Sequence, residues 1–368
     1  MAKKKKEKNF SSFLNNPIDF TLLITILLLL SLGLIMVLSA SSPSALSKNG
    51  DSYSYFSKQL LFAILGIAAM LFISKIDYRF YKKFYKHAWW IALILLALVL
   101  IAGRTVNGAK RWIYITETLS FQPSEIVKLL MIVFYAGVLM KNRDELPLYG
   151  KGFIKHVCFL APIIGLLLLE PHFSASIVII GICSIMMIMA GCKFWHYIAT
   201  GAIGGIPAMI LLIIKEPYRL KRVITFLDPW QDATGDGWQV IQSLYAIGSG
   251  GLFGAGLGES KQKFLYIPEP HNDFIFSILG EELGFIGCTA VLILFAIFIW
   301  RGILIAMRAP DMFGSLVAIG ITALVAIQVI INVAVVTSSM PATGMPLPFF
   351  SYRRNCFIYT PLWNGSIA

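Results

Sequence analysis

The sequence predicts an all-α membrane protein that crosses the bilayer many times. Hydrophobic residues make up 57% of the 368 positions and charged residues only 14%, and the mean hydropathy of +0.76 lies far above that of soluble domains. Apolar runs of about twenty residues, the length that a helix needs to span the hydrocarbon core, recur along the chain. Polar or basic stretches separate these runs. We therefore expect a polytopic helical fold.

Nine spans follow from the apolar runs. The first run is too long for a removable signal peptide and lacks a small-residue cleavage site. A basic tail, 1–17, precedes it, and the longest region without a span, 215–272, comes before the eighth. The spans are expected at 18–40, 59–76, 88–103, 123–140, 154–169, 173–190, 195–214, 273–299 and 313–336.

The basic residues predict the orientation of these spans. With the N-terminus in the cytoplasm, the tail and short loops on that side hold seventeen Lys and Arg, whereas the opposite short loops hold five. The stretches 77–90 and 301–308 are then cytoplasmic loops, and region 215–272 lies outside the cell. Because the net charge of +12 serves topology and anionic lipids, no nucleic-acid partner is expected.

No metal site is expected from the cysteines. They show neither CxxC nor Cys/His ligand spacing, and four of the five lie in apolar runs. We expect them to pack as small apolar side chains: Cys158, Cys183, Cys192, Cys288 and Cys356.

Carboxylates mark the start of the eighth span. A Pro-rich approach leads to Asp273, and Glu281 and Glu282 follow within the apolar run. Ionisable groups at membrane depth cost about 2.5–3.5 kcal/mol each on insertion scales, so they often mark a working site. Capping of the helix by Asn272 or Asp273 is the alternative, and the spacing leaves both roles open. Glu281 and Glu282 fall on different faces, below Asp273, so we expect them to pack or gate.

A second charged pair is expected in the fourth span. Glu125 and Lys128 lie three residues apart in an otherwise apolar run, and this spacing puts both side chains on one helix face, where they can pair. The pair either shapes a cavity and balances charge near a reacting site, or it is a buried structural pair.

Cations and glycines concentrate in region 215–272. Its glycine-rich tract, 248–258, would let backbone N–H groups approach an anion, although such tracts also serve tight packing. Basic side chains near a membrane surface suit phosphate or pyrophosphate groups, and ordinary headgroup anchoring is the alternative. These residues are Arg219, Lys221, Arg222, Lys261 and Lys263.

Five ordered motifs resemble those of the SEDS family of bacterial shape, elongation, division and sporulation proteins. The resemblance extends over about 17–352, and His271 with the preceding K-Q-K-F is closer to the division and sporulation branch than to the rod-elongation branch. The motifs are QPSExxK (122–128), DPWxD (228–232), WQxxQSxxAIGSGGxxGxG (238–256), PExHNDFIFSIxGEELG (268–284) and PATGMPLPFFSY (341–352).

The resemblance implies a ten-span fold and a peptidoglycan glycosyltransferase. Such an enzyme polymerises lipid II on the outer face of the bacterial cytoplasmic membrane, with a class B penicillin-binding protein as its partner. The resemblance also implies that Asp273 is the catalytic carboxylate and that Glu125 and Lys128 form the functional pair.

A reaction scheme follows from these implied roles. Asp273 would take the proton of the acceptor hydroxyl in one inverting displacement. The cations of region 215–272 would hold the leaving pyrophosphate, with or without Mg²⁺ or Mn²⁺, and His271 would support the site. A lipid II flippase and a non-catalytic scaffold for the synthase partner are the alternative functions.

The chain departs from the family pattern at two places. The family motif PDxGT is replaced by a turn in which His172 stands for the Asp, so the role of that Asp is in doubt here. After Tyr352 the family continues into a tenth span, whereas 353–368 contains a proline and is too short to cross a bilayer. We interpret this tail as the product of a frameshift. The expectation is nine spans and impaired activity.

Overall fold

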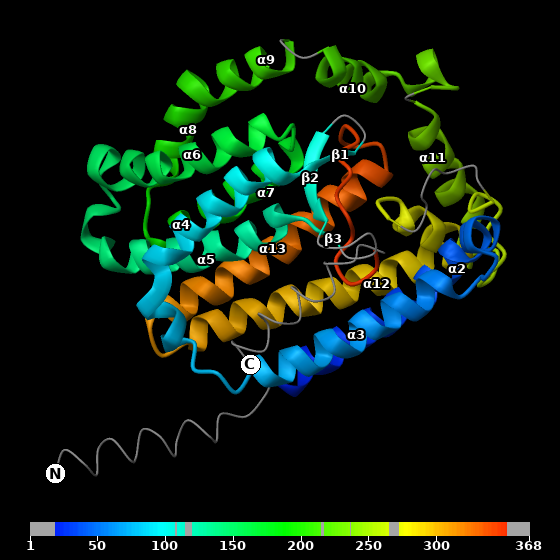
Figure 1. Ribbon diagram of the computed structural model, residues 1–368, viewed down its shortest axis with the longest axis horizontal. Coiled ribbons are helices and arrows are strands. Elements are labelled where there is room, and N and C mark those ends of the chain that lie inside the picture. The colour runs from blue at the N-terminus through cyan, green and yellow to red at the C-terminus, as the bar shows by residue number, and fades with distance from the viewer. Residues whose placement is uncertain are drawn as a thin grey trace.

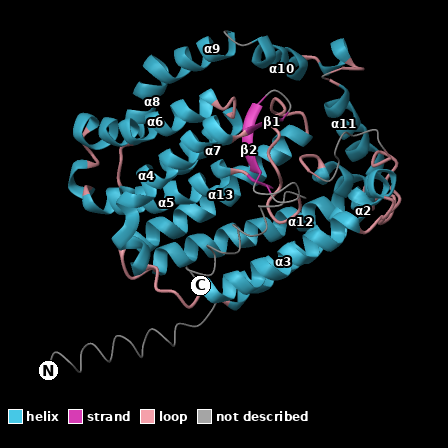
Figure 2. Cartoon of the chain, viewed as in Figure 1, coloured by secondary structure: helices cyan, strands magenta, loops and turns pink. Residues whose placement is uncertain are grey.

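The predicted helical fold is confirmed. The computed structural model describes residues 19–106, 109–114, 120–214, 217–235, 237–264 and 272–351. Long helices lie side by side through most of this chain (Figure 1), and strands form only a small patch (Figure 2). The expected aberrant tail, 353–368, lies outside the described residues.

Eight helices in the described ranges are long and apolar enough to cross a membrane. They are α2 (Phe20–Asn49), α3 (Ser54–Ile73), α4 (Arg79–Ala102), α5 (Pro123–Lys141), the π-helix η2 (Tyr149–Ile154) continued by α6 (Lys155–Leu169), α7 (Phe173–Ala190), α12 (Ile275–Arg308) and α13 (Met312–Val336). The shorter helical elements are η1 (Arg143–Glu145), α8 (Phe194–Thr200), η3 (Gly201–Gly205), α9 (Ile206–Ile214), α10 (Pro217–Leu227), η4 (Pro229–Asp232) and α11 (Trp238–Gly250).

The expected seventh span, 195–214, differs from the other eight. It is helical, but it runs as α8, the π-helix η3 and α9 in succession. Three of the five residues of η3 are glycines, which weaken an α-helix by about 1 kcal/mol each relative to alanine. The apolar run therefore forms a segmented helix instead of one regular span.

Two stretches expected as loops are helical, which corrects the sequence interpretation. Helix α4 already begins at Arg79, within the basic stretch 77–90, and α12 continues through 301–308 to Arg308. Helix α2 likewise runs beyond residue 40 to Asn49. The reason is physical: an apolar run marks the part of a helix that meets hydrocarbon, whereas the helix itself can continue into the headgroups and water.

Three short strands between α4 and α5 depart from the all-helical expectation. They are β1 (Arg104–Val106), β2 (Ala109–Tyr114) and β3 (Ser120–Phe121). Both pairings are antiparallel, in the order β1-β2-β3. Strand β2 contains Trp, Ile and Tyr, which favour strands, and β3 ends just before the first residue of α5.

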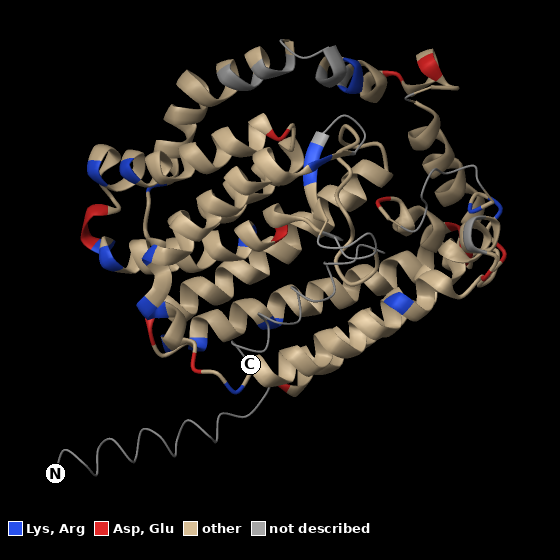
Figure 3. Cartoon of the chain, in the orientation of Figure 1, with Lys and Arg blue, Asp and Glu red and all other residues tan. Residues whose placement is uncertain are grey.

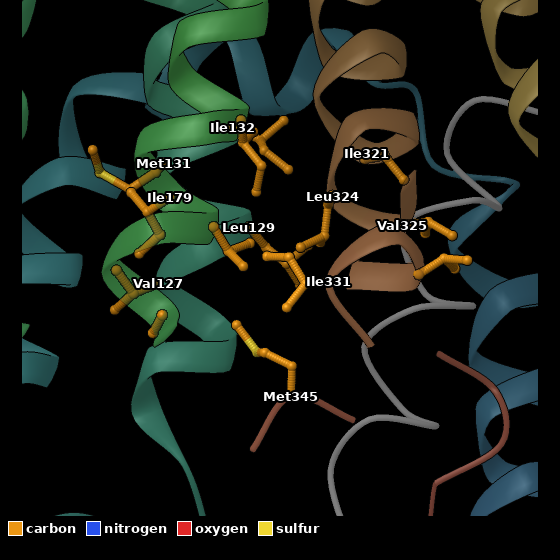
Figure 4. Packing of buried hydrophobic residues seen from close by; sticks show 14 of the residues in the cluster. Val127, Leu129, Met131, Ile132, Ile179, Ile321, Leu324, Val325, Ile331 and Met345 are labelled. Carbon is orange, nitrogen blue, oxygen red and sulfur yellow. The ribbon is translucent and has the colours of Figure 1, made fainter. Parts of the chain in front are cut away.

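The core lies where α5, α7 and α13 pack together. Figure 4 shows Leu129 and Ile132 facing Leu324 and Ile331 across this interface. The helices approach closely at Gly320, where an added Cβ would lie 2.6 Å from the side chain of Ile132. By contrast, α3 and the apolar part of α12 are mostly exposed, as expected of helices that face lipid.

The charged residues are distributed unevenly over the molecule. In Figure 3, many Lys and Arg gather at the end of the bundle where α4 begins and α5 ends. Two ion pairs lie at this end, Lys82 with Asp311 at 3.9 Å and Lys155 with Glu145 at 3.2 Å. This end is the one that the sequence predicts to be cytoplasmic.

Candidate functional site

Asp273 lies in the turn that leads into α12. The N-cap residue of that helix is Phe274, which makes no side-chain cap hydrogen bond, so neither Asn272 nor Asp273 occupies the capping position. The Asp273 side chain is partly exposed. The capping role that the sequence left open is therefore not observed at the N-cap position.

A buried amide fixes the backbone on both sides of the site. Asn332 of α13, only 1% exposed, donates hydrogen bonds from Nδ2 to the carbonyl oxygens of Asp273 (2.9 Å) and Met345 (2.7 Å). One side chain thus joins the turn before α12 to the segment that follows α13. Gly344 in that segment has a φ of +68°, and an added Cβ would lie 3.2 Å from Asp273 Oδ2. We name residues 341–345 the PATGM loop; it lies directly against the carboxylate.

The turn between α6 and α7 contacts the same loop. Ser174 Oγ donates to the carbonyl oxygen of Thr343 at 2.5 Å. His172 Nε2 lies 3.2 Å from Gln122 Nε2, and Arg111 donates to the carbonyl oxygen of Pro171. The turn that departs from the family pattern is therefore joined both to the PATGM loop and to the start of α5.

Glu170 is a buried carboxyl group in this turn. It is 1% exposed, and Oε1 has no hydrogen-bond partner among the described residues. Burial raises its pKa to about 8, and the positive charge of Arg111 opposes this rise. Sequence patterns do not single out Glu170, because a Glu at the end of an apolar run does not reveal whether its side chain is covered.

The predicted pair in α5 is confirmed as a contact. Lys128 Nζ lies 2.7 Å from Glu125 Oε2, and their side chains are 1% and 11% exposed. Gln122, which contacts His172, lies one helical turn before Glu125. Along α5, the pair therefore follows the residue that contacts the turn with His172.

Arg222 is the predicted cation that contacts the PATGM loop in the described residues. Its Nη1 donates to the carbonyl oxygen of Ala342 at 2.6 Å. The guanidinium lines a pocket of about 210 Å³ between α10, α11 and the start of the loop. Lys221 is exposed and pairs with Asp232 at 3.4 Å. The side chain of Arg219 and all of His271 lie outside the described residues.

Lys263 lies in a closed, buried cluster. Its side chain is 5% exposed, and Nζ lies 3.0 Å from Glu282 Oε1 and 3.2 Å from Ser39 Oγ. Nζ also donates to the carbonyl oxygen of Gly258. In this arrangement the charge of Lys263 is balanced by Glu282, rather than facing an open anion site. Spacing could not reveal this pair, because 19 residues of chain separate its members.

Glu281 binds the residues just before Lys263. Its carboxylate accepts hydrogen bonds from Ser260 Oγ and from the backbone N–H groups of Lys261 (2.8 Å) and Gln262 (3.4 Å). The sequence suggested packing or gating for the two glutamates. In the structure, Glu281 and Glu282 anchor the end of the glycine-rich region to α12.

The glycine-rich tract packs against a break in α12. Gly284 has φ +66° and ψ −165°, which interrupts the helix. The freed groups bond to the tract: Phe285 N donates to Gly251 O at 2.9 Å, and Ala255 N donates to Glu281 O at 2.9 Å. A Cβ on Gly254 would lie 2.2 Å from Glu282 O, so glycine is needed there for close approach. Of the two roles left open, this part of the tract shows packing.

Comparison with known proteins identifies the family. The model of the FtsW/RodA/SpoVE cell cycle proteins matches residues 20–360. The chain belongs to this family. It is 46% identical over 336 residues to stage V sporulation protein E of Bacillus subtilis strain 168, with 91% of each chain covered. It is 42% identical to a probable peptidoglycan glycosyltransferase FtsW of Trichlorobacter lovleyi, with 91% of this chain and 88% of the relative covered.

Solved structures of the FtsW/RodA/SpoVE fold agree with this assignment. A chain from a peptidoglycan synthase complex superposes with a TM-score of 0.78 at 27% identity, covering 96% of this chain and 97% of its own. RodA of Thermus thermophilus gives a TM-score of 0.72 at 25% identity, with 96% of each chain covered. The resemblance inferred from the five motifs, including the division and sporulation branch, is confirmed.

Proposed function

We propose that this chain is a peptidoglycan glycosyltransferase that polymerises lipid II on the outer face of the cytoplasmic membrane. Family membership and the names of its relatives support the activity. The observation that carries the proposal is the setting of Asp273, a partly exposed residue in the turn before a membrane helix, whose backbone carbonyl is held by Asn332 and whose Oδ2 is faced by Gly344.

Two polar contacts between α2 and α12 indicate how deep this end of α12 lies in the membrane. Arg301 pairs with Asp19 near one end of the helices, and Ser39 donates to Glu282 near the other. Nineteen or twenty residues separate the two contacts in each helix, which corresponds to about 30 Å, the thickness of the hydrocarbon core. Asp273 lies nine residues before Glu282, in the turn at the same end of α12 and on the same side of the break at Gly284.

This level suits the chemistry of a lipid-linked sugar. The contact of Ser39 with Glu282 would mark the edge of the core, so a carboxylate in the turn before α12 would lie close to the headgroups of that leaflet. There, the pyrophosphate of the donor would be level with the headgroups and its sugar would reach the carboxylate. The orientation follows from the positive-inside prediction, which places the basic end of the bundle in the cytoplasm.

Each of these residues would have a different role in an inverting transfer. Asp273 takes the proton from the acceptor hydroxyl as that oxygen attacks the anomeric carbon, and the pyrophosphate leaves with the bonding electrons. Arg222, next to the PATGM loop, stabilises the negative charge of the leaving group. Glu125 and Lys128 keep the inner wall of the site neutral overall.

A divalent cation would assist the same departure. Mg²⁺ or Mn²⁺ bound with the pyrophosphate would neutralise part of its charge. In the ranges that the structure describes, no group of three or more His, Cys, Asp or Glu side chains comes together to hold a metal. The partner we propose is a class B penicillin-binding protein, because one structural relative is a chain of a peptidoglycan synthase complex.

Replacement of Asp273 by Asn tests this function against its alternatives. The purified complex of the variant with its synthase partner should bind that partner normally and make no glycan strands from lipid II. A flippase would instead lose transport of lipid II across proteoliposomes, and a scaffold would lose neither activity. Glu259→Gln, which removes an exposed charge from the same region, is the matched control and should keep polymerisation.

A further inference from the structure

The segment after α11 exposes large apolar side chains although it has no regular secondary structure. We name residues 251–264 the glycine loop. Leu252, Phe253 and Leu257 in this loop are 63%, 80% and 57% exposed. Water would oppose such exposure, since a soluble surface rarely presents neighbouring large apolar residues together. The exposure therefore requires a covering partner.

The contacts of the glycine loop fix its level relative to the bilayer. Ile286 N donates to Leu252 O at 3.1 Å, and Gly256 N donates to Glu282 O at 3.0 Å. Glu282 itself lies about 30 Å from the Asp19 contact, at the edge of the hydrocarbon core. Figure 1 shows the chain after α11 lying beside α2 and α12. The loop is therefore level with this edge.

The neighbouring surface of α12 is also apolar and exposed. Phe285 and Ile286, which follow the helix break, are 65% and 53% exposed. They bond through their backbone to the glycine loop, so the exposed side chains of the loop continue the lipid-facing surface of a membrane helix. This continuity indicates that lipid, and not water, covers Leu252 and Phe253.

The middle of the loop has backbone groups that are bonded within the protein, as an apolar environment requires. Irregular chain enters lipid only where its N–H and C=O groups are bonded within the protein. Gly254 N bonds to Gly250 O at 2.8 Å, and Ala255 and Gly256 donate to α12. The break at Gly284 supplies the matching free groups on the helix.

We propose that the glycine loop is inserted into the outer leaflet, where Leu252, Phe253 and Leu257 contact acyl chains while the cluster of Lys263, Glu282 and Ser39 holds the loop at that depth. The assignment to the outer leaflet rests on the orientation proposed above, whereas insertion itself does not. A helix of another protein is the alternative occupant that the test must distinguish.

Photo-crosslinking tests the insertion directly. The full chain would carry benzoylphenylalanine at Phe253 in proteoliposomes of phosphatidylglycerol and phosphatidylethanolamine with alkyne-tagged acyl chains. We expect a tagged lipid adduct, with a several-fold lower yield when the probe stands at Glu259, an exposed polar position of the same loop. Equal yields at the two positions would overturn insertion, as would an adduct in native membranes that contains only another protein.

The holding role of the cluster needs a second experiment. Lys263→Met should reduce lipid labelling at Phe253 several-fold, whereas Lys261→Met, an exposed residue of the same loop, should leave it unchanged. Because a lone Glu282 could prevent folding, the double variant Lys263→Met with Glu282→Gln is included. Unchanged labelling in that folded double variant would refute the holding role.

The leaflet is tested independently of insertion. Glu259→Cys should react with a membrane-impermeant maleimide added to the outside of intact cells, whereas the parent chain gives the background. Reaction only after the cells are opened would overturn the orientation and with it the proposed function, while the lipid adduct at Phe253 would still stand.

Discussion

The two charged regions near the start of α12 differ in how their charge is accommodated. Lys263 and Glu282 are buried and balance each other. Asp273, nine residues earlier, is partly exposed, and its surroundings fix the backbone through Asn332. Paired charges of the first kind stabilise one arrangement of the chain, whereas a carboxylate of the second kind can meet a substrate. We therefore propose a structural role for Lys263 and Glu282 and a catalytic role for Asp273.

The largest effect on stability is expected from Lys263→Met. The substitution leaves the carboxylate of Glu282 buried without its partner, and breaking a buried pair in this way costs about 3–5 kcal/mol. Thermal unfolding in detergent measures the loss. Lys261→Met is the control, because that side chain is exposed, and a similar melting temperature for both variants would contradict the structural assignment.

Asn332→Ala should affect both stability and activity. It removes two hydrogen bonds and leaves two carbonyl oxygens, those of Asp273 and Met345, without this donor, at a cost of about 1–3 kcal/mol. Because the turn that carries Asp273 loses its support, kcat for lipid II polymerisation should fall more than KM rises. Thr337→Ala, an exposed change at the end of α13, is the control. An unaltered kcat in Asn332→Ala would show that the amide does not position the carboxylate.

Gly344→Ala isolates the contact with Asp273. Gly344 and Gly50 share nearly the same φ, +68° and +70°, so alanine at either position carries a similar backbone strain of about 1–2 kcal/mol. The new Cβ meets Asp273 Oδ2 at 3.2 Å only at position 344, whereas nothing lies within 4 Å at position 50. Both variants should melt at similar temperatures, and only Gly344→Ala should slow polymerisation. Equal polymerisation rates for the two variants would show that the PATGM loop does not form part of the site.

The last effect is a pH dependence of stability carried by Glu170. Its pKa is raised to about 8 in the folded chain from an ordinary value of 4.5, so the folded state keeps a proton that the unfolded state loses. Stability contributed in this way is fully present below pH 4.5 and is lost as the pH rises to about 8. The melting temperature of the parent chain should therefore fall across this range relative to that of Glu170→Gln. Parallel curves for the two proteins would contradict the burial of this carboxyl group.

Local patterns in the sequence were sufficient for part of the site. The pairing of Glu125 with Lys128 follows from a spacing of three residues on one helix, and the position of Asp273 before a span follows from the apolar run after it. Both inferences need only neighbouring residues. The motifs then supplied the family, which comparison confirmed.

Contacts between distant segments could not be predicted in this way. Ser39 and Glu282 are 243 positions apart, and no periodicity links Asn332 to the turn at Asp273. The glycine-rich tract left two roles open, because the break at Gly284 that it packs against is not visible in an apolar run. Strand β2 was missed for a different reason: short strands between helices carry too few residues for a clear alternation.

The most direct test compares Asp273, in the turn before α12, with Glu282, inside α12. Asp273→Asn and Glu282→Gln would be assayed for glycan-strand synthesis from purified lipid II, with each rate divided by the amount of folded protein. Our account predicts that Asp273→Asn is folded and slower by about 10²-fold or more, and that the folded fraction of Glu282→Gln works at nearly the parent rate. Normal synthesis by Asp273→Asn, or loss of synthesis by fully folded Glu282→Gln, would contradict it.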